Sequence, residues 1–196
     1  MYELPTQIIN SARKIIVIQA ENPDGDSLGS SLALEEILSD LDKEVVLYCP
    51  VEIPKYLRYI KGWDRVVSTF DTSADIAIIV DTAADVLITK VLETPGVRHF
   101  LEYHQVLVID HHTTDSNLSF DHTMLSGDAV ATSEVIYGLA AENGWGINPQ
   151  AAEHMLIAIM SDSLGLTTQN VSPNTFHVAG ELTKLGASNA VIEERR

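Results

Sequence analysis

The sequence predicts an α/β fold: a doubly wound, mainly parallel β-sheet flanked by helices, followed by a helical C-terminal portion. Two observations in the 196-residue chain predict it. Short runs of Val and Ile, such as Ile76–Val80, lack the in–out alternation of half-exposed strands and are typical of strands buried on both faces. These runs also alternate with longer segments of helical spacing, which favours a sheet covered by helices.

The order of the elements follows from the same pattern. We expect strands at Lys14–Gln19, Glu44–Tyr48, Ala74–Asp81 and Val106–Asp110, with a first helix from about Leu28 to Leu41. After residue 121 the spacing predicts three helices, at Ala129–Asn143, Gln150–Ser161 and Asn174–Leu185. Pro149 and Pro173 stand where two of them begin, a position that tolerates proline. We assign residues 1–185 to one domain and 186–196 to the start of a linker or C-terminal tail.

The composition limits the partners and the cellular setting. With 12 Lys+Arg against 28 Asp+Glu, the net charge of −16 argues against non-specific coating of nucleic acid. Carboxylates keep a protein soluble, but they are also the ligands that hard divalent metals select, and composition leaves both interpretations open. The single cysteine, Cys49, excludes an intramolecular disulfide and is expected to be a small buried residue. Without a secretory signal or a membrane-length apolar run, we expect a cytoplasmic protein with no membrane partner.

Acidic and imidazole side chains follow three of the predicted strands. They are Asp24, Asp26, Asp81, Asp110, His111 and His112. The carboxyl ends of parallel strands share one edge of a sheet, and ligands bind there, so these residues should form one cluster. Like charges so close would repel without a cation, which makes a metal the economical explanation. Asp162, at the end of a predicted helix, is a further ligand by residue type.

Each of these residues also has a structural interpretation when it is taken alone. Asp24–Gly25 is a turn dipeptide, Asp26 or Ser27 could cap the next helix, and Asp81 could begin a loop. Their joint occurrence at three strand ends favours a site. The remaining histidines lack such a setting and are expected to be surface or packing residues: His99, His104, His122, His154 and His177.

Four short motifs follow one another along the chain. They are Asn22–Ser30 (NPDGDSLGS), Val80–Thr82 (VDT), Val108–His112 (VIDHH) and Ser161–Ser163 (SDS), with a further helical segment at Ala131–Tyr137 (ATSEVIY). With these motifs the chain resembles the N-terminal domain of the DHH family of phosphoesterases. That family includes nanoRNA/pAp phosphatases, RecJ-type exonucleases, cyclic-dinucleotide phosphodiesterases and family II pyrophosphatases.

The resemblance implies a pair of divalent ions, usually manganese, with magnesium as the alternative. Asp81 would bridge the two ions and Asp24 would bind the first. The second ion would be held by Asp26, His111 and Asp162. Two such ions can clamp a phosphoryl group and stabilise both the attacking and the leaving oxygen.

The resemblance also assigns roles around the ions. His112 would face the substrate phosphate as a donor or proton relay, and Asp110 would orient the histidines from behind. Asn22, Ser27 and Ser30 are expected on the substrate side. The implied activity is that of a manganese-dependent phosphodiesterase or phosphatase for small nucleotides or short single-stranded oligonucleotides, with a second copy of the chain as a candidate partner.

The sequence departs from the family pattern in two respects. Ala20 stands where the family has a metal-binding histidine, so the first ion loses a ligand. Three interpretations follow: weaker binding of the first ion with residual activity, a protein that binds one metal, or an inactivating replacement. In addition, no segment matches the family's second, substrate-binding domain. The alternatives to a phosphoesterase are a non-catalytic metal- or nucleotide-binding regulatory module on the same fold, and an inorganic pyrophosphatase.

Overall fold

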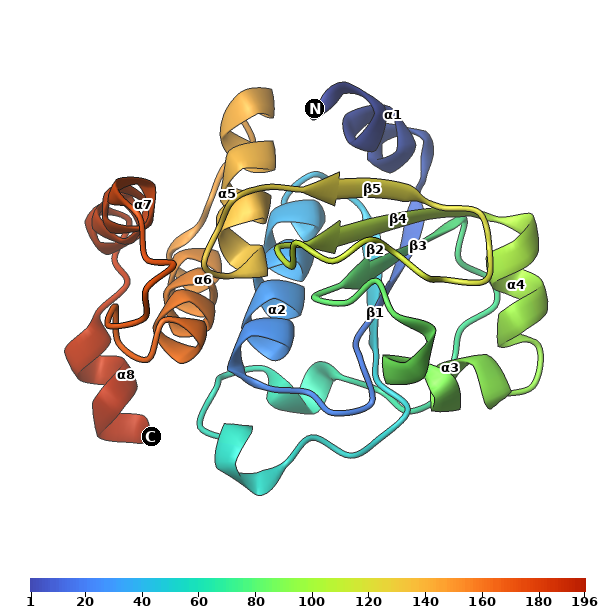
Figure 1. Ribbon diagram of the computed structural model, residues 1–196, viewed down its shortest axis with the longest axis horizontal. Coiled ribbons are helices and arrows are strands. Elements are labelled where there is room, and N and C mark those ends of the chain that lie inside the picture. The colour runs from blue at the N-terminus through green and yellow to red at the C-terminus, as the bar shows by residue number, and fades with distance from the viewer.

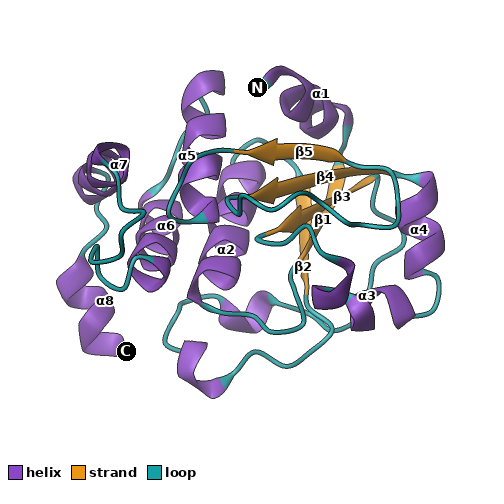
Figure 2. Ribbon diagram, viewed as in Figure 1, coloured by secondary structure: helices purple, strands orange, loops and turns teal.

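The computed structural model describes all residues 1–196 and contains one five-stranded sheet (Figures 1 and 2). All neighbouring strands are parallel, in the order β2-β1-β3-β4-β5. The strands are β1 (Lys14–Ile18), β2 (Glu44–Tyr48), β3 (Ile76–Val80), β4 (Gln105–Asp110) and β5 (Thr123–Ser126). The predicted parallel α/β fold is confirmed. The fifth strand was not predicted, because its four residues are too short and too polar to stand out.

The helices cover both faces of the sheet, and residues of β1 show how. Ile15 and Val17 point into a large core formed with α1, α2, α5 and α6, whereas Ile16 and Ile18 point into a smaller core formed with α3 and α4. Figure 1 shows α2, α5 and α6 on one side and α3 and α4 on the other, with α7 and α8 beyond α6. The helices are α1 (Glu3–Ser11), α2 (Gly25–Ser39), α3 (Thr89–Glu93), α4 (Val97–Tyr103), α5 (Thr132–Asn143), α6 (Pro149–Asp162), α7 (Pro173–Lys184) and α8 (Asn189–Arg195).

Several boundaries differ from the predicted ones. The first predicted helix, α2, begins at Gly25 rather than near Leu28, because Asp24 accepts a hydrogen bond from the Ser27 amide and caps it there. The short helices α1, α3 and α4 were not predicted. Residues 189–195, which we expected in a linker or tail, form α8 and bury Ile192 against the core.

Cys49 is buried and unpaired, and no helix is long and apolar enough to span a membrane.

Candidate metal centre

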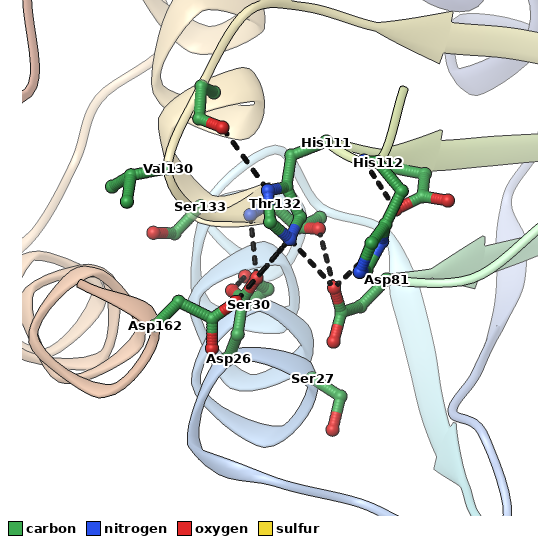
Figure 3. A network of polar contacts seen from close by, with 12 residues as sticks. Asp26, Ser27, Ser30, Asp81, His111, His112, Val130, Thr132, Ser133 and Asp162 are labelled. Atoms are coloured by element: carbon green, nitrogen blue, oxygen red, sulfur yellow. Dashed lines mark hydrogen bonds and ion pairs between the residues drawn. The ribbon is translucent and has the colours of Figure 1, made fainter. Parts of the chain in front are cut away.

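Four of the five metal-binding residues predicted from the sequence lie together at the carboxyl edge of the sheet (Figure 3). Asp81 follows β3, Asp110 ends β4, and His111 follows it. Two helices complete the cluster, since Asp26 lies in the first turn of α2 and Asp162 is the last residue of α6. Segments more than a hundred residues apart thus contribute to one site.

His111 is at the centre of this cluster. Its Nε2 lies 3.6 Å from a carboxylate oxygen of Asp26, 3.6 Å from one of Asp81 and 3.4 Å from one of Asp162. The same nitrogen is buried and has no hydrogen-bond partner. The other ring nitrogen, Nδ1, donates to the carbonyl of Ala129 at 3.2 Å, so a neutral ring keeps its lone pair on Nε2. His111 therefore belongs to two groups whose donor atoms lie within 4.8 Å of one another: Asp26, His111 and Asp162 form the first, and Asp81, Asp110, His111 and His112 form the second.

Close packing of α2 against α6 brings Asp162 near Asp26 and His111. A Cβ on Gly29 would lie 2.8 Å from the carbonyl oxygen of His154, and one on Gly25 would collide with the Ser161 side chain. Only glycine at these two positions, one helical turn apart, permits the observed approach. The two glycines of the first motif are thus explained by helix packing, and they set the distance between Asp26 and Asp162.

Hydrogen bonds fix the carboxylate of Asp26, which is completely buried. Ser30 Oγ donates to Oδ1 at 2.7 Å, and the Thr132 amide, in the first turn of α5, donates to Oδ2 at 2.7 Å. The Thr132 hydroxyl also donates to Asp81 at 3.1 Å. Sequence reasoning noted the segment containing Thr132 but missed its role, because contacts between distant segments leave no local signal.

Asp81 has an unusual backbone conformation. Its φ is +62°, in the left-handed region that non-glycine residues seldom adopt. Its amide nevertheless continues the sheet by donating to the Ile109 carbonyl at 2.9 Å. Strain of this kind persists where the surroundings hold it, and it is often found at functional sites. Here the turn directs the side chain towards His111 and Thr132 (Figure 3).

His112 lies on the solvent side of the cluster, with 52% of its side chain exposed. Its Nδ1 lies 2.7 Å from Asp110, which also accepts from the His112 backbone amide at 3.2 Å. We expected Asp110 to orient both histidines, but its hydrogen bonds with the pair are to His112, whereas Nδ1 of His111 donates to the Ala129 carbonyl. The donor atoms of Asp81, Asp110 and the two histidines also lie within 4.8 Å of one another.

The residues expected around a first ion converge less well. Asp24 is exposed, and its carboxylate caps α2, so it belongs to neither group of converging donors. Ala20 contributes only a methyl group, and the adjacent Glu21 turns away to accept from the Lys90 amide at 2.7 Å. Asn22 is exposed nearby, whereas the Ser27 hydroxyl is buried and accepts from the Asp24 amide.

The electrostatics of the cluster reflect an excess of carboxylates. Burial, followed by the charge of Asp162, raises the pKa of Asp26 to about 6. Burial, followed by the charge of Asp26, raises the pKa of Asp81 well above its ordinary value. Burial lowers the pKa of His111, but the interaction with Asp162 and the charge of Asp26 outweigh it and raise that pKa to about 9. Carboxylate oxygens around an unpaired imidazole nitrogen fit a divalent cation, whose charge would relieve this repulsion.

The chain is similar to known proteins over most of its length. The family model "DHH family, N-terminal domain" matches residues 14–159. The bifunctional oligoribonuclease and PAP phosphatase NrnA of Mycoplasma pneumoniae is 25% identical over 189 residues, covering 95% of this chain and 57% of the relative. A probable manganese-dependent inorganic pyrophosphatase of Enterococcus faecalis is 26% identical over 182 residues, covering 90% of this chain and 56% of the relative.

A solved structure shows the same fold. An exopolyphosphatase-related protein from Bacteroides fragilis superimposes with a TM-score of 0.88 at 24% identity, covering 99% of this chain and 59% of the other. The chain therefore spans less than two thirds of the length of the proteins that it matches.

Proposed function

Because the chain belongs to the DHH family, whose N-terminal domain matches residues 14–159, we propose that it is a metal-dependent phosphoesterase acting on small nucleotides or short oligonucleotides. The observation that carries the proposal is the unpaired, buried Nε2 of His111 facing three carboxylates. The NrnA relative, an oligoribonuclease and PAP phosphatase, supports this substrate class.

A divalent ion, with manganese as the first candidate, would be held by Asp26, His111 and Asp162, and Asp81, 3.6 Å from the same Nε2, would reach it from the second group. When bound, such an ion supplies a Lewis acid that polarises a phosphoryl group and lowers the pKa of water. The manganese-dependent relative from Enterococcus supports this choice of metal. We expect a further ion to bind more weakly, because Asp24 stands outside the converging donors and Ala20 supplies no ligand.

The chain's own residues would prepare the site for an anionic substrate. Asp110 fixes Nδ1 of His112 and, through this hydrogen bond, raises the pKa of His112. That bond leaves Nε2 of the half-exposed ring available to donate to a phosphate oxygen or to the leaving group. Thr132 and Ser30 hold the carboxylates of Asp81 and Asp26 in place, which limits reorganisation when the site is used.

Two other functions each have a specific observation in their favour. The Enterococcus relative favours inorganic pyrophosphate as the substrate of the same site. Ala20, together with the displaced position of Asp24, favours a module that binds a metal or nucleotide without hydrolysing it.

A substrate panel with Mn²⁺ separates these functions. The purified chain is incubated with an RNA dinucleotide, with pAp and with pyrophosphate, and the products are separated by chromatography. We expect the unsubstituted chain to cleave the RNA dinucleotide to mononucleotide and to convert pAp to a nucleoside monophosphate. We expect the Asp26→Asn variant to form neither product. Hydrolysis of pyrophosphate alone would favour the pyrophosphatase, and Mn²⁺ binding without any hydrolysis would favour the binding module.

A further inference from the structure

Glu134 is a buried acid that the proposed chemistry does not use. It lies in the first turn of α5 and is 4% exposed. Its Oε2 accepts from the Val130 amide at 2.9 Å and from the Thr175 hydroxyl at 3.1 Å, and its Oε1 accepts from the Asn174 side chain at 3.0 Å. Both oxygens therefore only accept hydrogen bonds, as the oxygens of a carboxylate do.

The Val130 amide belongs to the same peptide group as the Ala129 carbonyl. That carbonyl accepts from Nδ1 of His111 at 3.2 Å. A peptide group is planar and rigid, so the contact at its N–H end fixes the direction of its C=O end. A continuous line of hydrogen bonds thus runs from Glu134 through one peptide group to His111.

We propose that Glu134 is a positioning residue that acts on His111 through the Ala129–Val130 peptide group. Hydrogen bonds in a chain polarise one another, so a carboxylate at the N–H end makes the carbonyl oxygen a stronger acceptor. A stronger acceptor holds one proton of His111 on Nδ1, so that Nε2, the nitrogen facing the carboxylates, is the one that releases its proton and becomes the electron-pair donor when a metal ion binds. Metal-binding histidines commonly have a carboxylate or carbonyl in this position, and here the two act in series.

The inference rests on the proposed metal site and gives α5 and α7 a role in it. Asn174 and Thr175 lie in the first turn of α7, so that helix holds Glu134 against the peptide. A purely structural role for Glu134, as a cap for the first turn of α5, makes a different prediction. A neutral side chain of the same shape, which still accepts from Val130, would then be sufficient.

The test compares Glu134→Gln with Ile136→Val. Glu134→Gln keeps the shape of the side chain and removes its charge, whereas Ile136→Val trims a buried apolar residue of the same helix that belongs to the large hydrophobic core. Mn²⁺ affinity is measured by calorimetry and stability by thermal unfolding. Removal of a group that supports a metal ligand typically weakens metal binding 10–100-fold, and we expect about 10-fold for Glu134→Gln. Ile136→Val should lower the melting temperature and leave the affinity unchanged.

A second readout does not depend on metal. The proton on Nδ1 of His111 is observed by NMR in the ¹⁵N-labelled, metal-free protein, and we expect an upfield shift in Glu134→Gln because its acceptor has weakened. An unchanged proton shift would overturn the inference, as would an Mn²⁺ affinity within twofold of the unsubstituted protein. If the chain binds no metal, the proposed function fails, while the proton shift still decides the role of Glu134.

Discussion

Substitution of Gly29 by alanine tests whether the approach of α2 to α6 builds the metal centre. The added Cβ would lie 2.8 Å from the His154 carbonyl oxygen and 3.2 Å from Ala158, both on α6. A backbone oxygen cannot rotate away, so the helices must separate by about 0.6 Å to restore the ordinary contact distance of 3.4 Å. Asp162 lies on the same face of α6, four residues beyond Ala158, and would move with it.

The magnitude follows from two opposing effects. Alanine in place of glycine in a helix stabilises by about 1 kcal/mol, whereas overpacking costs about 1–3 kcal/mol. Gly180 in α7 is a matched control, because a Cβ there would meet nothing within 4 Å. We therefore expect Gly29→Ala to be less stable than Gly180→Ala by about 1–3 kcal/mol.

Urea denaturation measures this difference in the free energy of unfolding, and calorimetry with Mn²⁺ measures the effect on the site. We expect about tenfold weaker Mn²⁺ binding in Gly29→Ala, since the groups supporting a metal site tolerate little displacement, and unchanged binding in Gly180→Ala. Equal stability of the two variants, with equal Mn²⁺ affinity, would show that the close approach of α2 to α6 does not build the metal centre.

Three further predictions address catalysis, the first ion and pH. His112→Ala should lower kcat about 10²–10⁴-fold while Mn²⁺ affinity changes little, and an unchanged kcat would remove His112 from the chemistry. Ala20→His should raise Mn²⁺ stoichiometry from one ion to two in equilibrium dialysis, whereas a constant stoichiometry would show that position 20 does not limit the first ion. Burial lowers the pKa of His154 to about 4, so the unfolded chain takes up the proton first as pH falls. The free energy of unfolding should therefore fall by about 2 kcal/mol between pH 7 and pH 5 because of this residue. Urea denaturation should show a smaller fall in the free energy of unfolding for His154→Gln than for the unsubstituted protein. The same dependence on pH in both would contradict the lowered pKa of His154.

The sequence was sufficient to predict the core of the fold and most of the converging side chains. Runs such as Ile76–Val80, apolar on both faces, are typical of a covered parallel sheet, and the carboxyl ends of such strands share an edge. Residues that end strands, such as Asp81 and Asp110, could therefore be placed before the structure was known. Their proximity is confirmed, and their roles in metal binding and catalysis stay predictions.

The remaining features depend on contacts that no local pattern records. Thr132 reaches Asp26 because α5 begins beside α2, at a separation of 106 residues in sequence. The replacement of Asp110 by the Ala129 carbonyl as the partner of His111 likewise depends on how a loop folds back over β4. The short strand β5 and the short helices α3 and α4 are stabilised by packing more than by their own sequences.

The central claim is that His111 and the surrounding carboxylates bind a divalent ion. Anomalous scattering from crystals soaked in Mn²⁺ tests it most directly. We predict a strong peak beside Nε2 of His111, among the carboxylates of Asp26, Asp81 and Asp162, with any second peak near Asp24 weaker. The absence of a peak beside His111 would contradict it.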